Sequence, residues 1–286
     1  MNKDSKVAGP VGATPILGGP ILEAPILEAP ILEAKDYGAP SAFTPENLLR
    51  EARRQKAVSG DPVPDICVLD PDGDIARHMQ RAGRALRHAG WACYHTDLFT
   101  VEQDGLSLGI VPRAVGASFA VVVAEQLFAS GCRLLISITS SGQLAPAKTL
   151  PYFILIEKAL RDEGTSYHYL PPAAFAEAPD GLIGRLADAY DTIRAPVRRG
   201  AVWTTDAPYR ETESALAAMR ARGLLAVEME AAALYAFARA RHRQVVCFAL
   251  VTNQMGLVEG DFEKGPADGS ADALAVVVAT AKRLLG

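Results

Sequence analysis

The sequence predicts an α/β fold, with one domain in which buried strands alternate with helices. Short apolar runs typical of buried strands recur from residue 63 onward, and segments of helical length separate them. This alternation favours a sheet with helices on both of its faces. The composition, with 49% hydrophobic and 22% charged residues in a chain of 286, is that of a globular protein with a large core.

The N-terminal part of the chain differs from the rest. Residues 15–34 read PILGG followed by three copies of PILEA. A proline at every fifth residue prevents a continuous helix and interrupts strand pairing. We therefore expect residues 1–40 to form a low-complexity, poorly ordered tail and residues 41–286 to form the domain. The isoleucines and leucines of the repeat leave open a role in binding a partner.

The first expected element is a helical lead-in at residues 44–56, with Thr44 as its N-cap and Pro45 at the first helical position. Strands are expected where apolar, β-branched or aromatic residues follow one another, and helices where longer runs of mixed polarity lie between them. Gly131 marks the end of one such helix. The expected strands are 66–69, 91–95, 106–111, 134–138, 201–204 and 245–251, and the expected helices are 75–88, 118–129, 152–163, 182–192, 213–221, 232–241 and 272–285.

Charge and residue usage argue against several classes of protein. A net charge of −4 and a pI near 5.8 give no general electrostatic reason to bind nucleic acid or an anionic membrane. The four cysteines form no CxxC pair and the five histidines form no HExxH motif, so we expect reduced, buried thiols and neither metal nor cofactor. No apolar run reaches the roughly 18 residues of a membrane helix, and no signal-peptide core is present. We expect a cytoplasmic protein.

Polar side chains follow the expected strands at several points along the chain. The segments 70–74, 139–142, 204–212 and 252–254 all come directly after buried strands. In open α/β sheets, ligands bind at the carboxyl ends of strands. The sequence therefore predicts a small polar ligand that is held by several loops.

The most informative segment is Glu228-Met229-Glu230, which stands between an apolar run and an alanine-rich helix. Carboxylates are costly to bury without partners. An ionised carboxylate accepts hydrogen bonds only, which suits the hydroxyls of a sugar. The alternative is a helix N-terminus with two acids placed favourably against its dipole. We interpret Glu230 as the sugar-binding carboxylate and Glu228 as the more structural one.

Two other segments suit the remaining parts of such a ligand. Thr139-Ser140-Ser141-Gly142 offers hydroxyls and backbone N–H groups to an anion or a sugar oxygen, although a plain polar turn would look the same. Tyr209 and Arg210 could stack on a flat heterocycle and bond to it, although a capped turn is the simpler explanation.

Taken in order, residues 116–142, 203–212, 227–238 and 251–253 resemble the nucleoside phosphorylase superfamily, nearest to its uridine phosphorylase branch. The Glu-Met-Glu motif is the most specific mark, and the resemblance covers roughly residues 63–286. It implies a three-layer αβα sandwich with a mixed, partly barrel-like sheet. It also implies an enzyme of nucleoside metabolism that cleaves N-glycosidic bonds, usually with phosphate as co-substrate. Members are homo-oligomers (dimers, trimers or hexamers) in which neighbours complete each other's sites.

The resemblance also implies roles for individual residues. Asn253 falls where purine-cleaving relatives place a catalytic aspartate. The family's Gln-x-Arg pair for the base is not reproduced. The implied roles are ribose binding by Glu230 with Met229 and Glu228, phosphate and ribose contacts by Ser140, Ser141 and Gly142, and base recognition by Arg210 with Tyr209 and Thr205.

The phosphate side of the expected site departs from the family pattern. The family has a Gly-Asp-Pro turn followed closely by arginine, but this chain reads Leu-Asp-Pro-Asp-Gly-Asp at residues 69–74. Arg77 is the nearest candidate cation, and Arg113 could compensate. Ser137 and Thr96, beside His95, stand where further family arginines are expected. A phosphate dianion needs cations, and the nearby aspartates would repel it.

Two alternatives follow from these departures. Relatives of the same fold hydrolyse nucleosides with an acid in the first turn, and Asp72 or Asp74 could activate water in that way. Against this, such hydrolases also need an aspartate where this chain has Asn253. A third possibility is a nucleoside-binding or interaction protein without catalysis, with the repeat tail as its docking element.

Overall fold

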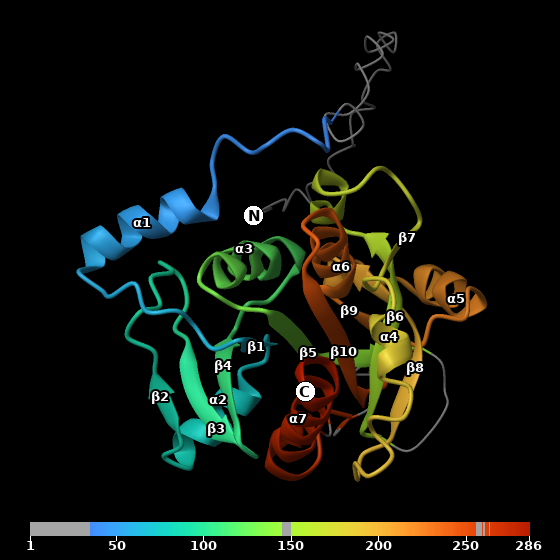
Figure 1. Ribbon diagram of the computed structural model, residues 1–286. Coiled ribbons are helices and arrows are strands. Elements are labelled where there is room, and N and C mark those ends of the chain that lie inside the picture. Colours follow the sequence, from blue (N-terminus) through green and yellow to red (C-terminus); the bar gives the residue numbers. More distant parts are fainter. Residues whose placement is uncertain (1–34, 145–149, 256–258, 260, 263) are drawn as a thin grey trace, which may run out of the picture.

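The computed structural model describes residues 35–286 except 145–149, 256–258, 260 and 263, so the expected repeat tail at 15–34 lies outside the described residues. The described chain forms three layers (Figure 1). Helices α3 (Ala117–Ala129) and α6 (Ala231–Ala240) cover one face of a central sheet, and α2 (Asp74–Arg81) and α7 (Ser270–Leu285) cover the other. The predicted αβα sandwich is confirmed.

The sheet is mixed and partly closed on itself. Strand β10 pairs with β6 on one side and with β5 on the other, so β10, β6, β8, β9 and β5 form a barrel-like ring, from which β1, β4, β3 and β2 extend. Parallel pairs such as β1–β5 and β5–β10 stand beside antiparallel pairs such as β6–β10 and β3–β4. The strands are β1 (Ile66–Asp70), β2 (Ala85–Arg87), β3 (Phe99–Gln103), β4 (Leu106–Pro112), β5 (Leu134–Gln143), β6 (Tyr152–Asp162), β7 (Phe175–Glu177), β8 (Val197–Thr205), β9 (Ala226–Glu228) and β10 (Gln244–Asn253).

Several helices agree with the expectation from sequence. Helix α1 spans Pro45–Lys56, and Thr44 caps it by accepting from the backbone N–H of Asn47. Helix α5 spans Glu213–Ala221, as expected, and α3, α6 and α7 match within two residues. None of the helices in the described part of the chain has both the length and the apolar character needed to cross a membrane.

Other expectations were wrong in instructive ways. The segment 152–163, expected as a helix, is strand β6; its first residues are fully buried between β10 and β8, and this burial overrides the helical propensity of residues 157–161. The expected helix 75–88 ends at Arg81, because Gly83 takes a positive φ of 67° and the chain turns into β2. Helix 182–192 is reduced to α4 (Leu182–Arg185) followed by turns, residues 91–95 form no strand, and the polar segment 139–142 continues β5.

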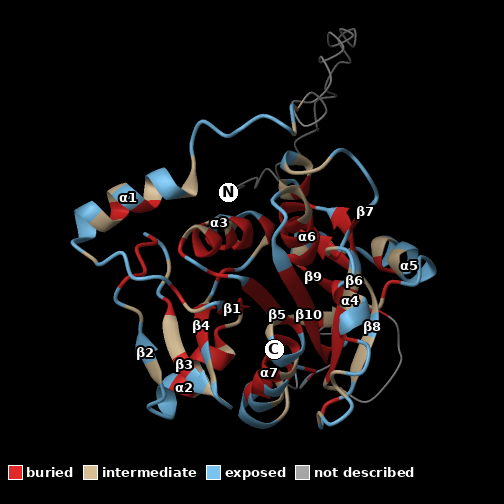
Figure 2. Cartoon of the chain, viewed as in Figure 1, coloured by how far each residue is buried: buried red, intermediate tan, exposed pale blue. Residues whose placement is uncertain are grey.

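Two apolar cores lie on opposite faces of the sheet, as the buried residues in Figure 2 show. The first eight residues of α6, residues 231–238, are all buried against the barrel and α3. Because five of these eight side chains are alanine, the helix can lie close to the sheet. The start of α6 is thereby fixed at the edge of the barrel.

A buried tyrosine of α6 connects two strands where their pairing ends. Strands β10 and β6 pair as far as Phe248 and Leu155, so Cys247 and Ile156 would be the next pair. The hydroxyl of Tyr235 lies between them, donating to the Ile156 carbonyl at 2.6 Å and accepting from the Cys247 N–H at 3.1 Å. Each backbone group thus keeps a partner although the strands diverge.

We expect Tyr235→Phe to lower the free energy of unfolding by about 2 kcal/mol, because it leaves two buried backbone groups without a partner. Urea denaturation with an unchanged m-value would measure this loss. The matched control is Tyr94→Phe, which removes a hydroxyl from a side chain that is 42% exposed and should cost less than about 0.5 kcal/mol. Equal losses in both variants would contradict the bridging role.

Candidate functional site

The polar strand ends predicted from sequence meet at one edge of the sheet. Strand β5 lies between β1 and β10 and runs parallel to both, so their carboxyl ends are adjacent. Ring closure brings in the other two strands, because Gly142 of β5 pairs with Val227 of β9, and β9 pairs with Trp203 and Thr204 of β8. Residues far apart in the sequence therefore share this edge.

Glu228 is the structural anchor of this edge. Its side chain is 3% exposed, and one carboxylate oxygen accepts from the backbone N–H groups of Glu230 at 2.8 Å and Ala231 at 2.7 Å. The other oxygen accepts from the hydroxyl of Thr204, which itself accepts from the N–H of Ala232 at 3.0 Å. The carboxylate thus satisfies donors at the start of α6 that have no intrahelical partner.

Glu230 has a different environment. It is 1% exposed, and its Oε1 atom accepts from the N–H of Gly116 at 2.7 Å, at the start of α3. The hydroxyl of Thr139 on β5 donates to the Ser140 carbonyl at 3.3 Å and lies near enough to Glu230 to lower the pKa of its carboxyl. The Oε2 atom is buried and has no hydrogen-bond partner among the described residues. An acceptor of this kind is held in place on one side and available to a ligand on the other.

The two buried carboxyls, Glu228 and Glu230, are not equally ionised. Burial raises the pKa of both side chains, and repulsion from Glu228 raises the pKa of Glu230 further. Two like charges so close together in a buried site do not ionise independently. Glu228 receives three hydrogen bonds that favour its charged form, so we assign the negative charge to Glu228 and the proton to Glu230 when no ligand is bound.

Ser141 and Gly142, at the end of β5, lie beside the end of β10, where Asn253 is aligned with Gly142. Asn253 donates through Nδ2 to the Ser141 carbonyl at 3.4 Å, and its Oδ1 accepts from the N–H of Met255 at 2.9 Å. The hydroxyl of Ser141 is buried and has no partner among the described residues. A Cβ at Gly142 would meet the sulfur of Met255, so a larger residue here would require the Met255 side chain to move.

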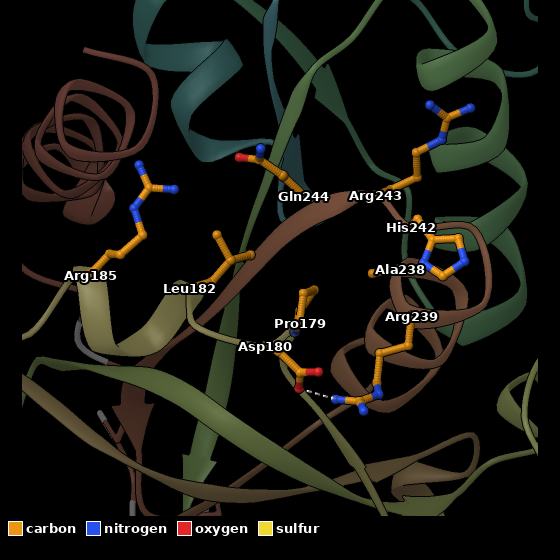
Figure 3. Close-up of a pocket in the computed structure, with 9 residues that line it drawn as sticks. All are labelled: Pro179, Asp180, Leu182, Arg185, Ala238, Arg239, His242, Arg243 and Gln244. Atoms are coloured by element: carbon orange, nitrogen blue, oxygen red, sulfur yellow. Dashed lines mark hydrogen bonds and ion pairs between the residues drawn. The ribbon is translucent and has the colours of Figure 1, made fainter.

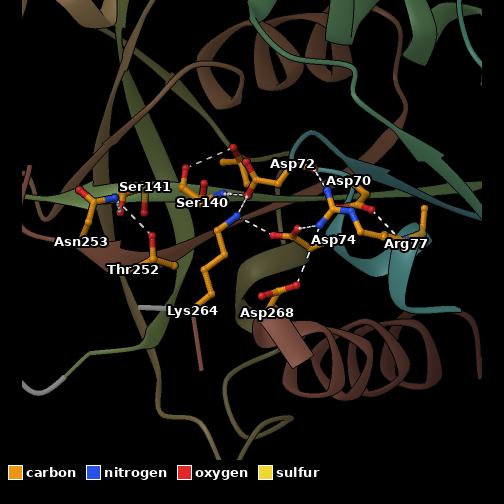
Figure 4. Close-up of polar contacts among 12 residues, drawn as sticks. Asp70, Asp72, Asp74, Arg77, Ser140, Ser141, Thr252, Asn253, Lys264 and Asp268 are labelled. Carbon is orange, nitrogen blue, oxygen red and sulfur yellow. Dashed lines mark hydrogen bonds and ion pairs between the residues drawn. The ribbon is translucent and has the colours of Figure 1, made fainter. Parts of the chain in front are cut away.

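The turn after β1 carries a cluster of charges (Figure 4). The Oδ2 atom of Asp72 accepts from the N–H of Ser140 and lies 3.1 Å from the ammonium of Lys264, which also pairs with Asp74. Arg77 pairs with Asp74 from the opposite side. Asp70 is buried and accepts from the N–H of Ala76 at 2.9 Å; burial raises its pKa to about 7, which reduces its charge at neutral pH.

The residues expected to contact the base are not brought to the edge together. Tyr209 is fully exposed and Arg210 is exposed, both on the short 3₁₀ helix η2 (Pro208–Arg210). Thr205 is buried, and its hydroxyl accepts from the N–H of Ala207 at 3.2 Å. Met229 is half-buried beside Glu230.

The positions that replace the family's arginines have separate roles. The hydroxyl of Thr96 accepts from the indole N–H of Trp91 at 3.0 Å. Ser137 is buried between Leu69 and Cys247 in neighbouring strands, and its hydroxyl has no partner among the described residues. The side chain of Arg113 packs over Gly73.

Sequence analysis missed Lys264 and Gly116. Lys264 is the only basic residue between Asn253 and Ser270, which is a weak signal within an acidic segment. Nothing in the sequence shows that this segment returns to the turn after β1. Gly116 contributes a backbone N–H, which no residue type reveals.

A separate cavity of about 440 Å³ lies near the amino end of β10 (Figure 3). Basic side chains line it, but they have structural partners: Arg239 pairs with Asp180, and Arg185 donates to the carbonyl of Leu284 at the end of α7. None of the predicted site residues lines this cavity.

Comparisons with known proteins agree with this arrangement. A family model described as the phosphorylase superfamily matches residues 71–284. The chain is 30% identical over 142 residues to a purine nucleoside phosphorylase DeoD-type from Myxococcus xanthus, covering 49% of this chain and 59% of that protein. It is 27% identical over 172 residues to a guanosine phosphorylase from Halorubrum lacusprofundi, covering 59% and 68%. The chain thus spans less than two thirds of the length of the Myxococcus protein.

Among solved structures, the model is similar to uridine phosphorylase from Vibrio fischeri ES114. The TM-score is 0.64 at 21% identity, with 80% of this chain and 93% of that chain covered. The same enzyme complexed with 6-hydroxy-1-naphthoic acid gives a TM-score of 0.64 at 20% identity. At this level of identity the likeness concerns the fold alone.

The charge assignment predicts opposite effects for two variants. A carboxyl whose pKa is higher in the folded protein binds more protons when folded, so its burial lowers stability progressively as pH rises above the ordinary value of 4.5. We expect Glu230→Gln to raise the free energy of unfolding by about 1–3 kcal/mol near pH 8, with the gain vanishing toward pH 4.5. Denaturant titrations at a series of pH values would measure this.

The matched comparison is Glu228→Gln, which should lower stability by about 1–3 kcal/mol near neutral pH because an amide cannot accept on both sides as the carboxylate does. Stabilisation by Glu228→Gln together with destabilisation by Glu230→Gln would reverse the assignment of the charge.

Proposed function

The chain belongs to the phosphorylase superfamily, and we propose that it cleaves the N-glycosidic bond of a nucleoside at the buried carboxyl of Glu230, with phosphate as co-substrate. The observation that carries the proposal is the buried Oε2 atom of Glu230, which has no hydrogen-bond partner among the described residues and lies where α3 and α6 begin. A nucleoside brings donors to this acceptor through its ribose hydroxyls.

The sugar fits the chemistry of this edge. Two adjacent hydroxyls can donate to the carboxylate oxygens of Glu230, and bonding to a diol favours the ionised form of a group that is otherwise protonated. The half-buried side chain of Met229 would pack against the apolar face of the ring. Glu228 would not touch the sugar, because both of its oxygens are occupied by Thr204 and the start of α6.

The proposed reaction breaks the bond between C1′ of the ribose and the nitrogen of the base. The bonding electrons leave with the base, and positive charge develops on the sugar ring. Ionised Glu230, bound to the hydroxyls of the same ring, stabilises this charge. A phosphate oxygen then bonds to C1′ from the opposite face, and the departing nitrogen takes a proton from hydrogen phosphate or water, giving free base and pentose 1-phosphate.

The base would extend toward the end of β8. Thr205 is buried there, and Tyr209 and Arg210 follow on η2. The side chains of Tyr209 and Arg210 are both exposed, so binding of the base would require them to move over the nucleoside. Asn253 would serve as a positioning residue, because its amide holds the backbone of Ser141 and Met255 and has no acidic proton to give.

A second candidate is hydrolysis of the same bond with Asp72 activating water. One observation favours it: the carboxylate of Asp72 already lies at the N–H of Ser140, where the expected phosphate contact would be. The two candidates share the sugar site and differ in the nucleophile.

We expect release of free base from at least one member of a nucleoside panel, and only when phosphate is present. Chromatography of the released base, with and without phosphate, would measure this. Phosphate-independent release would favour the second candidate. Binding of nucleosides without any release would contradict both and leave a non-catalytic binding protein.

Glu230→Gln should lower kcat/KM by at least about a hundredfold, because a neutral amide cannot stabilise the positive charge on the sugar. The matched control is Glu125→Gln, a partly buried glutamate in the middle of α3 that contacts Tyr169 and Arg241. The control should retain activity. Unchanged turnover in Glu230→Gln would remove Glu230 from the sugar site.

A further inference from the structure

One oxygen atom of Asp72 lies where two donors from distant elements converge. The N–H of Ser140, at the end of β5, and the ammonium of Lys264, between β10 and α7, are each 3.1 Å from Oδ2 of Asp72 (Figure 4). A backbone N–H and a cation directed at one point form an anion site. In this structure an anionic side chain of the protein itself occupies that point.

We propose that Asp72 is a built-in occupant of the anion site, and that inorganic phosphate binds by displacing its carboxylate from Ser140 and Lys264. The inference rests on the proposed function, which makes phosphate the co-substrate, and it adds Lys264 as the cation that holds this anion. Asp72 is then a specificity-determining residue, since any incoming anion must compete with it.

The geometry allows Asp72 to leave. Its side chain is 30% exposed, so the carboxylate can turn outward into water. Asp74 is only 12% exposed and is held by both Arg77 and Lys264, so it stays in place. The two aspartates therefore have different roles. Asp74 orients Lys264, and Asp72 occupies the anion site.

Lys264 remains charged throughout this exchange. Burial alone would lower the pKa of its ammonium group, but the contacts with Asp74 and Asp72 outweigh burial and raise the pKa above its ordinary value. Arg77 cannot take the same part, because Asp74 lies between its guanidinium and Lys264. Lys264 is thus the cation that would contact the phosphate nucleophile.

The test measures binding of inorganic phosphate by calorimetry, without nucleoside, to the full chain and to single variants. Asp72→Asn should lower the dissociation constant about tenfold, because it removes the competing charge and its repulsion. Lys264→Met should raise it by at least about tenfold. Circular dichroism would confirm that each variant is folded.

The matched control variants each remove one charge, negative or positive, at a position outside the anion site. Asp188→Asn removes a carboxylate that pairs with Arg283, and Lys282→Met removes an exposed ammonium from α7. Both should leave the phosphate dissociation constant within about twofold of the unmodified chain, which would exclude an effect of net charge alone.

Weaker or unchanged phosphate binding by Asp72→Asn, or no phosphate binding by any variant, would overturn the inference. Failure of the proposed function would look different, because phosphate would bind more tightly to Asp72→Asn while no nucleoside released its base. Release of base by water, with no phosphate bound by any variant, would refute the built-in occupant and leave glycosidic cleavage standing.

Discussion

The arrangement of the site depends on two carboxyls that are buried two residues apart. Such a pair is tolerated when one member carries the charge and is fully hydrogen-bonded. Glu228 meets this condition because the N–H groups of Glu230 and Ala231, which have no intrahelical partner, and the hydroxyl of Thr204 all donate to it. Since these donors belong to β8 and α6, the carboxylate fixes the helix to the barrel. Glu230 is placed as a result, with one oxygen on Gly116 and the other left without a partner among the described residues.

The closed ring of strands makes this placement possible. Glu228 lies on β9, which is only three residues long and is held by β8 on one side and β5 on the other. An open sheet would leave such a short strand at an edge. Closure through β10 and the Tyr235 hydroxyl instead keeps the ends of β5, β8 and β9 together. The alanines of α6 contribute by allowing the helix to approach the ring closely.

Sequence reasoning identified the parts of the molecule where local chemistry decides the structure. Thr44 and Pro45 specify the start of α1, and the apolar run of β10 could only be a buried strand. Sequence reasoning failed for β6. Its polar residues from Glu157 onward favour a helix locally, but pairing with β8 in the closed ring makes them a strand. The candidate site shows the same difference. The motif at 228–230 pointed to Glu230, which the structure shows to be buried, whereas the contact of Lys264 with Asp74 depends on a long-range return of the chain that no local pattern encodes.

The turn after β1, residues 71–73, contains no basic residue. Gly73 has a positive φ of 73°, and the Cβ of any larger residue there would lie 3.5 Å from the side chain of Arg113. A basic side chain at that position would therefore be strained by the positive φ, although its Cβ would make only an ordinary contact with Arg113. The cation that contacts Asp72 comes instead from the segment before α7, which contributes Lys264. Under the proposed displacement of Asp72, the acidic turn and Lys264 form one unit, because Asp74 orients the cation that phosphate would contact.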